Sequence, residues 1–141
     1  MSIQAQLLPL FVEVLLTFGL VIWLAVLRSR DLGSRTVQMR DIALREPAWS
    51  PRTLQIGYCF SNQFELPVLF YVLTILSIYT HHADLIFVVL AWVFVVFRLL
   101  HAYVHTTTNH VRHRGMLWGV AALALFIAWI IFIVRILAGL P

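Results

Sequence analysis

The sequence contains no lysine and a single cysteine, and only 11% of its 141 residues are charged. A soluble domain carries about 25% charged residues, so this chain has too few to cover a water-facing surface. That scarcity excludes an ordinary cytosolic enzyme and a disordered tail. The one cysteine, Cys59, cannot form an internal disulfide and belongs to no metal motif, so we expect it to fill space in or near a helix.

Apolar sequence is abundant instead, at 62% of the residues, with a mean hydropathy of +0.92. Four apolar runs each approach the ~20 residues that cross a bilayer as a helix. The first run lacks the basic segment and cleavage site of a signal peptide, so we expect it to be retained. We therefore predict an all-α integral membrane protein, a single four-helix domain over residues 1–141. Its helices are expected near residues 7–27, 51–80, 84–105 and 116–138.

All ten basic residues are arginines, and the net charge is +4. Most of them lie in two connections, residues 28–50 and the segment TTTNHVRHRG over residues 106–115. Because these charges cluster between apolar runs, they indicate membrane loops rather than nucleic-acid binding. The positive-inside rule places both Arg-rich connections in the cytoplasm and both termini outside it.

The second helix is expected to begin before its apolar run. Ser50 followed by Pro51 is typical of an N-cap and a first helical residue. The helix would then leave the membrane at its cytoplasmic end and carry polar residues down to Glu65. Pro67 cannot donate to the carbonyl four residues earlier, so it predicts a kink beside Asn62 and Glu65.

Arg98, His101 and His105 follow one face of the third expected helix, in its cytoplasmic half. They form either a cationic wall for an anionic ligand or an arginine that reaches the headgroups beside two interfacial histidines. Glu65 is expected at a depth where it meets Arg98 or His101. That ion pair would either join the second and third helices or be shared with a polar substrate. Asn62 lies on the same helical face as Glu65, and the two side chains could hydrogen-bond a ligand together.

Two further charges lie toward the other side of the membrane. Glu13 and Arg135 are expected at similar depths, which predicts a structural ion pair between the first and fourth helices. At the cytoplasmic side, Arg28 is expected level with Asn62 and His105, and Arg112 and Arg114 lie at the start of the fourth helix. Such a cationic rim suits an anionic small molecule or an acidic lipid headgroup.

The six histidines do not predict a metal centre. His81 and His82 lie near the outer face while His101 and His105 lie near the inner one, so no pair at matched depth could bind haem. The spacing of His105, His110 and His113 matches no zinc signature. We expect no metal site.

Three motifs together resemble the MAPEG family, the membrane-associated proteins in eicosanoid and glutathione metabolism. They are the segment NQFELP over residues 62–67, Arg98-x-x-His101, and NHVRHR over residues 109–114. The sequence is most similar to the short bacterial branch of that family. Ser61, His105 and Trp118 stand where the eukaryotic enzymes tend to carry arginine or tyrosine, which leaves fewer hydroxyls and less charge at the rim.

The resemblance implies a homotrimer of four-helix protomers with glutathione as co-substrate, bound between neighbouring protomers at the cytoplasmic face. It implies that Arg114 activates the glutathione thiol. The residues that would hold the tripeptide are Arg28, Asn62, Glu65, Arg98, His101, His105 and Arg112. A guanidinium near a thiol favours the thiolate, which attacks an electrophile or reduces a hydroperoxide. The bilayer would supply a hydrophobic small-molecule substrate.

Two functions remain open from the sequence. One is a membrane glutathione transferase or peroxidase-like enzyme that acts on hydrophobic electrophiles through an arginine-stabilised thiolate. The alternative is a non-catalytic protein of the same fold that binds an acidic lipid or a partner helix.

Overall fold

The computed structural model describes residues 1–43 and 48–140, and over these residues it contains helices and no strands. Four helical segments are long and apolar enough to cross a membrane. They are α1 (Ile3–Gly33), the interrupted segment of α2 (Pro51–Ser61) and α3 (Leu66–Tyr79), α4 (Leu85–Thr106) and α5 (Val111–Ala138). Two 3-10 turns, η1 (Met39–Ile42) and η2 (Asn62–Phe64), complete the order. Arg45 and Glu46 of the Arg-rich connection lie outside the described residues.

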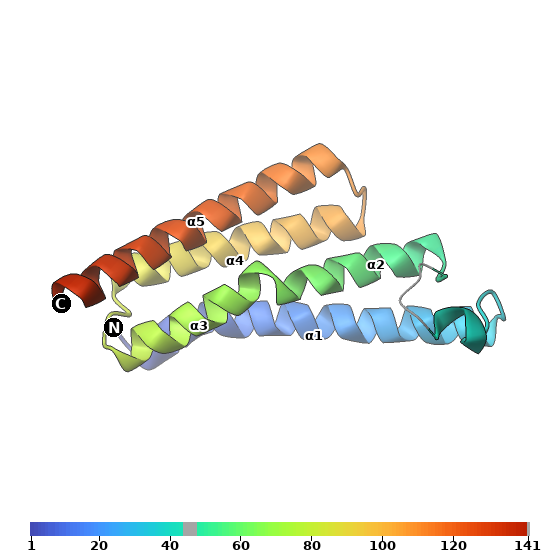
Figure 1. The fold of residues 1–141 in the computed structure, drawn as a ribbon, viewed down its shortest axis with the longest axis horizontal. Coiled ribbons are helices and arrows are strands. Elements are labelled where there is room, and N and C mark those ends of the chain that lie inside the picture. Colours follow the sequence, from blue (N-terminus) through green and yellow to red (C-terminus); the bar gives the residue numbers. More distant parts are fainter. Residues whose placement is uncertain (44–47, 141) are drawn as a thin grey trace.

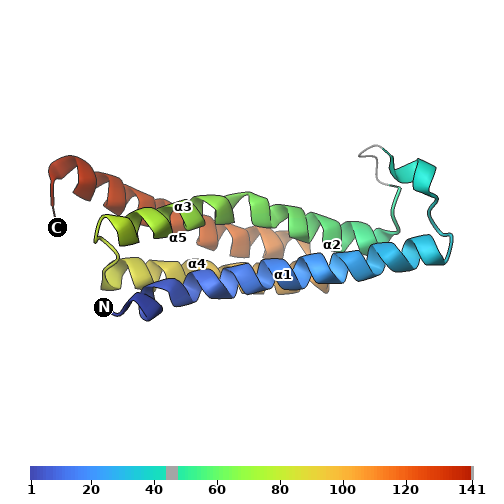
Figure 2. The same cartoon turned by 90° about the horizontal axis from the view of Figure 1, so that it is seen from below.

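The four segments run up and down as an antiparallel bundle, with both termini at one end (Figure 1). We call this the terminal end and the opposite one the Arg-rich end. In Figure 1, α4 lies between α5 on one side and α1, α2 and α3 on the other, and Figure 2 shows α4 running beside α1. The rings of Phe70 in α3 and Phe94 in α4 stack 4.7 Å apart in the apolar core. The predicted four-helix membrane fold is therefore confirmed.

Two of the helices are longer than predicted, because hydrophobic length underestimates helical length. The first helix extends beyond residues 7–27 at both ends. It begins after Ser2, whose hydroxyl accepts from Ala5 N–H at 3.3 Å, and it continues through polar residues to Gly33. The fourth begins at Val111 rather than near residue 116, so Arg112 and Arg114 are helical. Helical hydrogen bonds form in water as well as in lipid, so a helix does not end where its apolar run ends.

The second span starts as predicted, with Ser50 as the N-cap and Pro51 as the first helical residue. The predicted kink is a complete interruption, in which α2 ends at Ser61 and α3 starts at Leu66. Pro67 lies in the first turn of α3, where its missing N–H costs nothing, but it leaves the carbonyl of Gln63 without a helical donor. One tight turn, η2, bridges the two helices and exposes backbone carbonyls to neighbouring groups.

Polar contacts hold α1, α2 and α4 together at the Arg-rich end. The carboxylate of Asp31 accepts hydrogen bonds from the hydroxyls of Ser50 at 2.8 Å and Thr53 at 2.7 Å. The side chain of Gln55 donates to the carbonyl of His105 at 2.7 Å. These contacts place the start of α2 level with residue 31 of α1 and with the last turn of α4.

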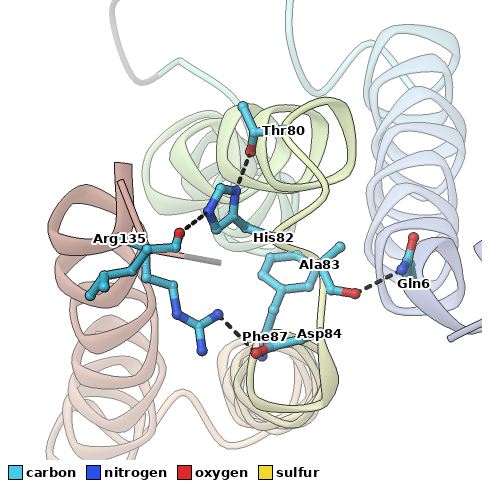
Figure 3. A network of polar contacts seen from close by, with 8 residues as sticks. Gln6, Thr80, His82, Ala83, Asp84, Phe87 and Arg135 are labelled. Carbon is cyan, nitrogen blue, oxygen red and sulfur yellow. Dashed lines mark hydrogen bonds and ion pairs between the residues drawn. The ribbon is translucent and has the colours of Figure 1, made fainter. Parts of the chain in front are cut away.

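A second polar network joins the helices at the terminal end (Figure 3). Arg135 of α5 forms an ion pair with Asp84, the N-cap of α4, at 2.8 Å. Gln6 of α1 donates to the carbonyl of Ala83 at 2.7 Å, and His82 contacts the carbonyl of Leu140 at 2.9 Å. The predicted pairing of Arg135 with Glu13 is therefore wrong, because Arg135 lies in the last turn of α5 and reaches the turn that precedes α4.

The Asp84–Arg135 pair predicts a loss of stability in acid. Burial raises the pKa of the Asp84 carboxyl, but the Phe87 N–H and the Arg135 guanidinium together bring it below its ordinary value of 3.8. A lowered folded-state pKa contributes stability above the ordinary value, and that stability disappears as the pH falls through the lowered value. Because the carboxylate is partly exposed, we expect an effect below about 1 kcal/mol.

Thermal unfolding in detergent as a function of pH measures this contribution. Asp84→Asn should flatten the fall in melting temperature below pH 3.8 and leave the rest of the profile parallel to the wild type. An unchanged acid limb in that variant would mean that the pair contributes no measurable stability.

Candidate functional site

Two opposite charges meet in the middle of the bundle. Nε of Arg98 in α4 lies 3.6 Å from Oε1 of Glu13 in α1, and both side chains are 0% exposed. Ionisable groups inside a membrane are costly, so such a pair marks a structural or functional centre. Glu13 therefore pairs with Arg98 rather than with the predicted partner Arg135.

Gln63 completes this contact from the interruption between α2 and α3. We assign the amide orientation in which its nitrogen donates to Oε1 of Glu13 at 3.0 Å and its oxygen accepts from Nη2 of Arg98 at 3.1 Å. The opposite orientation would turn the amide oxygen toward the carboxylate. Gln63 is 1% exposed, so all three side chains lie inside the protein. We call Glu13, Gln63 and Arg98 the buried polar network.

Arg98 also binds the residue that begins the interruption. Its Nη2 donates to the backbone carbonyl of Asn62 at 3.0 Å, and its Nη1 lies 3.4 Å from Oδ1 of the same residue. A guanidinium can serve several acceptors at once because its five N–H groups lie in one rigid plane. The guanidinium thus fixes Asn62, which is half-buried, in place.

The sequence analysis predicted that Glu65 meets Arg98 or His101, and the structure shows that it contacts neither. It is exposed and forms no ion pair among the residues that the structure describes. The reason is the turn η2, which directs Gln63 inward and leaves Glu65 on the outer side. The carboxylate that neutralises Arg98 comes from α1 instead.

His101 and His105 lie on the same face of α4 as Arg98, and both are buried. The rings of the two histidines meet edge to face at 5.6 Å. Nδ1 of His101 lies 3.0 Å from the carbonyl of Arg114 and therefore donates to it, which leaves Nε2 as the acceptor nitrogen. This contact places Arg114 of α5 level with His101 and one turn from Arg98.

Arg114 is partly exposed, and its side chain is held in place. Its Nη1 donates to Oδ1 of Asn109 at 2.6 Å. Asn109 has a φ of 51°, a left-handed conformation that asparagine tolerates, and its own N–H donates to the carbonyl of Val104 at 2.7 Å. Asn109, in the turn that follows α4, thus orients the guanidinium of Arg114.

The structure separates Arg28 from Asn62, which the sequence analysis placed at one level. Asp31 of α1 lies level with Thr53 of α2 through their hydrogen bond. From there, the helical rise places Asn62 about 9 Å deeper than Arg28 along the bundle axis. The guanidinium of Arg28 lies over the ring of Trp49, 5.1 Å from its centre. Arg112 is exposed on the first turn of α5.

An apolar groove runs between α3 and α5 and begins one residue after Glu65. Its volume is about 740 Å³, within the usual size range of small-molecule sites. Its lining residues are Leu66, Leu69, Ala122, Leu123, Leu125, Phe126 and Trp129.

The structure brings together five of the predicted site residues and adds two that the sequence analysis did not include. The five, which lie within about two helical turns of one another, are Asn62, Arg98, His101, His105 and Arg114. Gln63 and Asn109 join them through hydrogen bonds. The position of Gln63 between Asn62 and the break at Pro67 was the signal that could have identified it. Within residues 1–43 and 48–140, no group of three or more potential metal ligands occurs.

The sequence model of the MAPEG family matches residues 6–134, which is nearly the whole chain. No curated protein and no solved structure matches this chain. The matched region contains all four membrane segments, apart from the first residues of α1 and the last of α5, and every residue of the site described above. The chain therefore belongs to the MAPEG family, whose membership supports a membrane function in glutathione or eicosanoid metabolism.

Proposed function

We propose that this protein is a membrane glutathione transferase or peroxidase that acts on hydrophobic electrophiles. The observation that carries the proposal is the placement of Arg114, whose guanidinium is partly exposed and oriented by Asn109. A cation fixed beside a thiol favours the thiolate over the neutral form. The thiolate, formed as the thiol gives up its proton to water, then attacks an electrophilic carbon and displaces its leaving group. With a hydroperoxide it attacks the outer oxygen, the O–O bond breaks and an alcohol leaves, and a second glutathione converts the resulting sulfenic acid to the disulfide and water.

The groups around Arg114 suit the remaining parts of a tripeptide. Asn62 offers an amide that is held from behind by Arg98, and Glu65 offers an exposed carboxylate to an ammonium group. His101 and Arg112 lie on the facing helices α4 and α5. Guanidinium groups bind carboxylates in a two-pronged geometry, so Arg112 and Arg28 are the proposed partners of the two glutathione carboxylates.

This assignment requires more than one chain. Arg28 lies on α1 and Arg114 on α5, and these helices lie on opposite sides of α4 (Figure 1). One glutathione can contact both arginines only if α1 of one chain packs beside α5 of another. We therefore propose a homotrimer with the site between neighbouring protomers, its Arg-rich end facing the cytoplasm as the positive-inside rule predicts.

The groove between α3 and α5 is the proposed entry for the second substrate. It opens sideways from the bundle and is lined by apolar side chains, so a lipophilic molecule can reach it from the bilayer. Its start at Leu66, next to Glu65, supports this proposal because Glu65 is one of the proposed glutathione contacts.

A thiolate titration tests the proposal. With the protein purified in detergent, the ultraviolet absorbance of the glutathione thiolate is followed against pH, and micelles without protein serve as the control. We expect thiolate below the pKa of about 8.5 typical of a free thiol. A titration identical to that in empty micelles would contradict the proposal and favour the binding of an acidic lipid at the arginines.

Asn109 offers a specific test of how Arg114 is oriented. Asn109→Gly keeps the left-handed turn but removes the acceptor of the Arg114 guanidinium. The loss of one hydrogen bond is worth about 1 kcal/mol, so we expect a roughly fivefold lower conjugation rate. Asn109→Asp, which keeps an acceptor oxygen, should retain the wild-type rate. Equal rates for the wild type and the glycine variant would show that Asn109 does not orient Arg114.

A further inference from the structure

The buried polar network connects three separate parts of the chain. Glu13 comes from α1, Gln63 from the turn η2 and Arg98 from α4, and each is at most 1% exposed. A side chain without exposed surface cannot contact a ligand, so none of the three is a direct binding residue. Their contacts lead instead to Asn62, which is half-buried at the same turn.

Stability alone does not account for these charges. Oε2 of Glu13 and Nε of Arg98 have no hydrogen-bond partner among the described residues, so the network is only partly satisfied. Replacing a buried ion pair by apolar side chains of similar size is often neutral or stabilising. An apolar pair would therefore fill this space without a loss of stability, but it would leave the carbonyl of Asn62 without its donor.

The helix interruption is where the network acts on the backbone. Pro67 removes the helical donor of the Gln63 carbonyl, and the guanidinium of Arg98 donates to the neighbouring carbonyl of Asn62. Gln63 is held inward by its contacts to Glu13 and Arg98. With Gln63 directed inward, Glu65 is exposed, and Asn62 is half-buried with its carbonyl bound by Arg98.

We propose that Glu13, Gln63 and Arg98 are positioning residues that fix residues 62–65 and thereby set the affinity of the site for glutathione. This inference rests on the proposed function for its ligand. It assigns Arg98 a role different from direct contact with the tripeptide. Glu13, whose partner was predicted to be Arg135, becomes part of the binding site's support.

The test uses the charge-free double variant Glu13→Leu with Arg98→Met in the full chain, purified in detergent. We expect it to fold with a melting temperature near that of the wild type, while KM for glutathione rises roughly tenfold to a hundredfold and kcat changes less. Gln63→Met, which removes only the amide, should shift KM in the same direction by a smaller factor. Thr74→Val is the matched control, because Thr74 is buried in α3 and its hydroxyl bonds only the Phe70 carbonyl.

Hydrogen–deuterium exchange of the backbone amides gives a measurement that does not depend on glutathione. In the double variant, residues 62–66 should exchange at least about tenfold faster than in the wild type, while α4 and α5 remain unchanged. The control Thr74→Val should leave residues 62–66 as protected as in the wild type.

The two measurements separate the two proposals. A wild-type protein that binds no glutathione contradicts the proposed function, and the exchange rates still decide whether the network fixes the turn. A double variant with wild-type KM and wild-type exchange at residues 62–66 overturns the inference and leaves the proposed function intact. A kcat that falls with an unchanged KM also overturns it, because a positioning role in binding requires a change in affinity.

Discussion

Replacing Arg98 by methionine is expected to lower the free energy of unfolding by about 3–5 kcal/mol. The substitution leaves the carboxylate of Glu13 buried in an apolar interior with only the Gln63 amide as a partner. It also removes the donor to the Asn62 carbonyl at the helix interruption. Thermal or denaturant unfolding in detergent micelles, followed by helical circular dichroism, measures the loss.

The double variant Glu13→Leu with Arg98→Met distinguishes two causes of the lost stability, an uncompensated buried charge and a packing defect. If the cost arises from an uncompensated charge, removal of the second charge restores most of the stability, and the interaction energy in the double-mutant cycle is large. Glu13→Leu alone should be destabilising for the same reason, because it leaves the guanidinium unpaired. Additive losses, with a double variant less stable than either single variant, would contradict this explanation and indicate a packing defect.

The partner of Glu13 illustrates what the sequence could and could not determine. The apolar run begins near residue 7, which places Glu13 about two turns from the end of the helix and near the depth of Arg135. The helix begins at Ile3, so Glu13 lies about 15 Å from the terminal end, while Arg98 lies about 20 Å from the start of α4. Arg135 is only about 5 Å from the end of α5. An error of one turn in a boundary was enough to select the wrong pair.

The membrane segments themselves were predictable because hydrocarbon allows few alternatives to a helix. The interruption at residues 62–65 was predictable in part, since proline removes a backbone donor wherever it occurs. Which side chains point inward at such a break is a tertiary property. Gln63 is buried and Glu65 exposed because the carboxylate and the guanidinium of neighbouring helices hold the Gln63 amide, and periodicity along a single helix carries no information about those neighbours.

The substitution of Arg114 by alanine is expected to reduce the rate of glutathione conjugation at least ~100-fold, with a much smaller change in KM for glutathione. A group that stabilises charge developed during the reaction contributes about 10²–10³ in kcat when it is preorganised. Arg114 is preorganised by Asn109 on its side chain and by His101 on its backbone carbonyl. The measurement is steady-state conjugation of glutathione to a chlorodinitrobenzene, with the protein in detergent.

Arg40→Ala is the control for loss of a positive charge, because Arg40 is an exposed arginine of the long connection whose ion-pair partner among the described residues is Asp41. It should leave kcat unchanged.

Arg114→Lys tests whether the positive charge alone is sufficient. Lysine keeps the charge but lacks the planar guanidinium and its paired N–H donors. The variant should therefore retain part of the wild-type rate if charge alone stabilises the thiolate, and none of it if the two-pronged contact is required. Conjugation by Arg114→Ala at the wild-type rate would remove Arg114 from the mechanism. The thiolate would then need another cation, for which Arg112, two residues earlier in the first turn of α5, is the nearest choice in sequence.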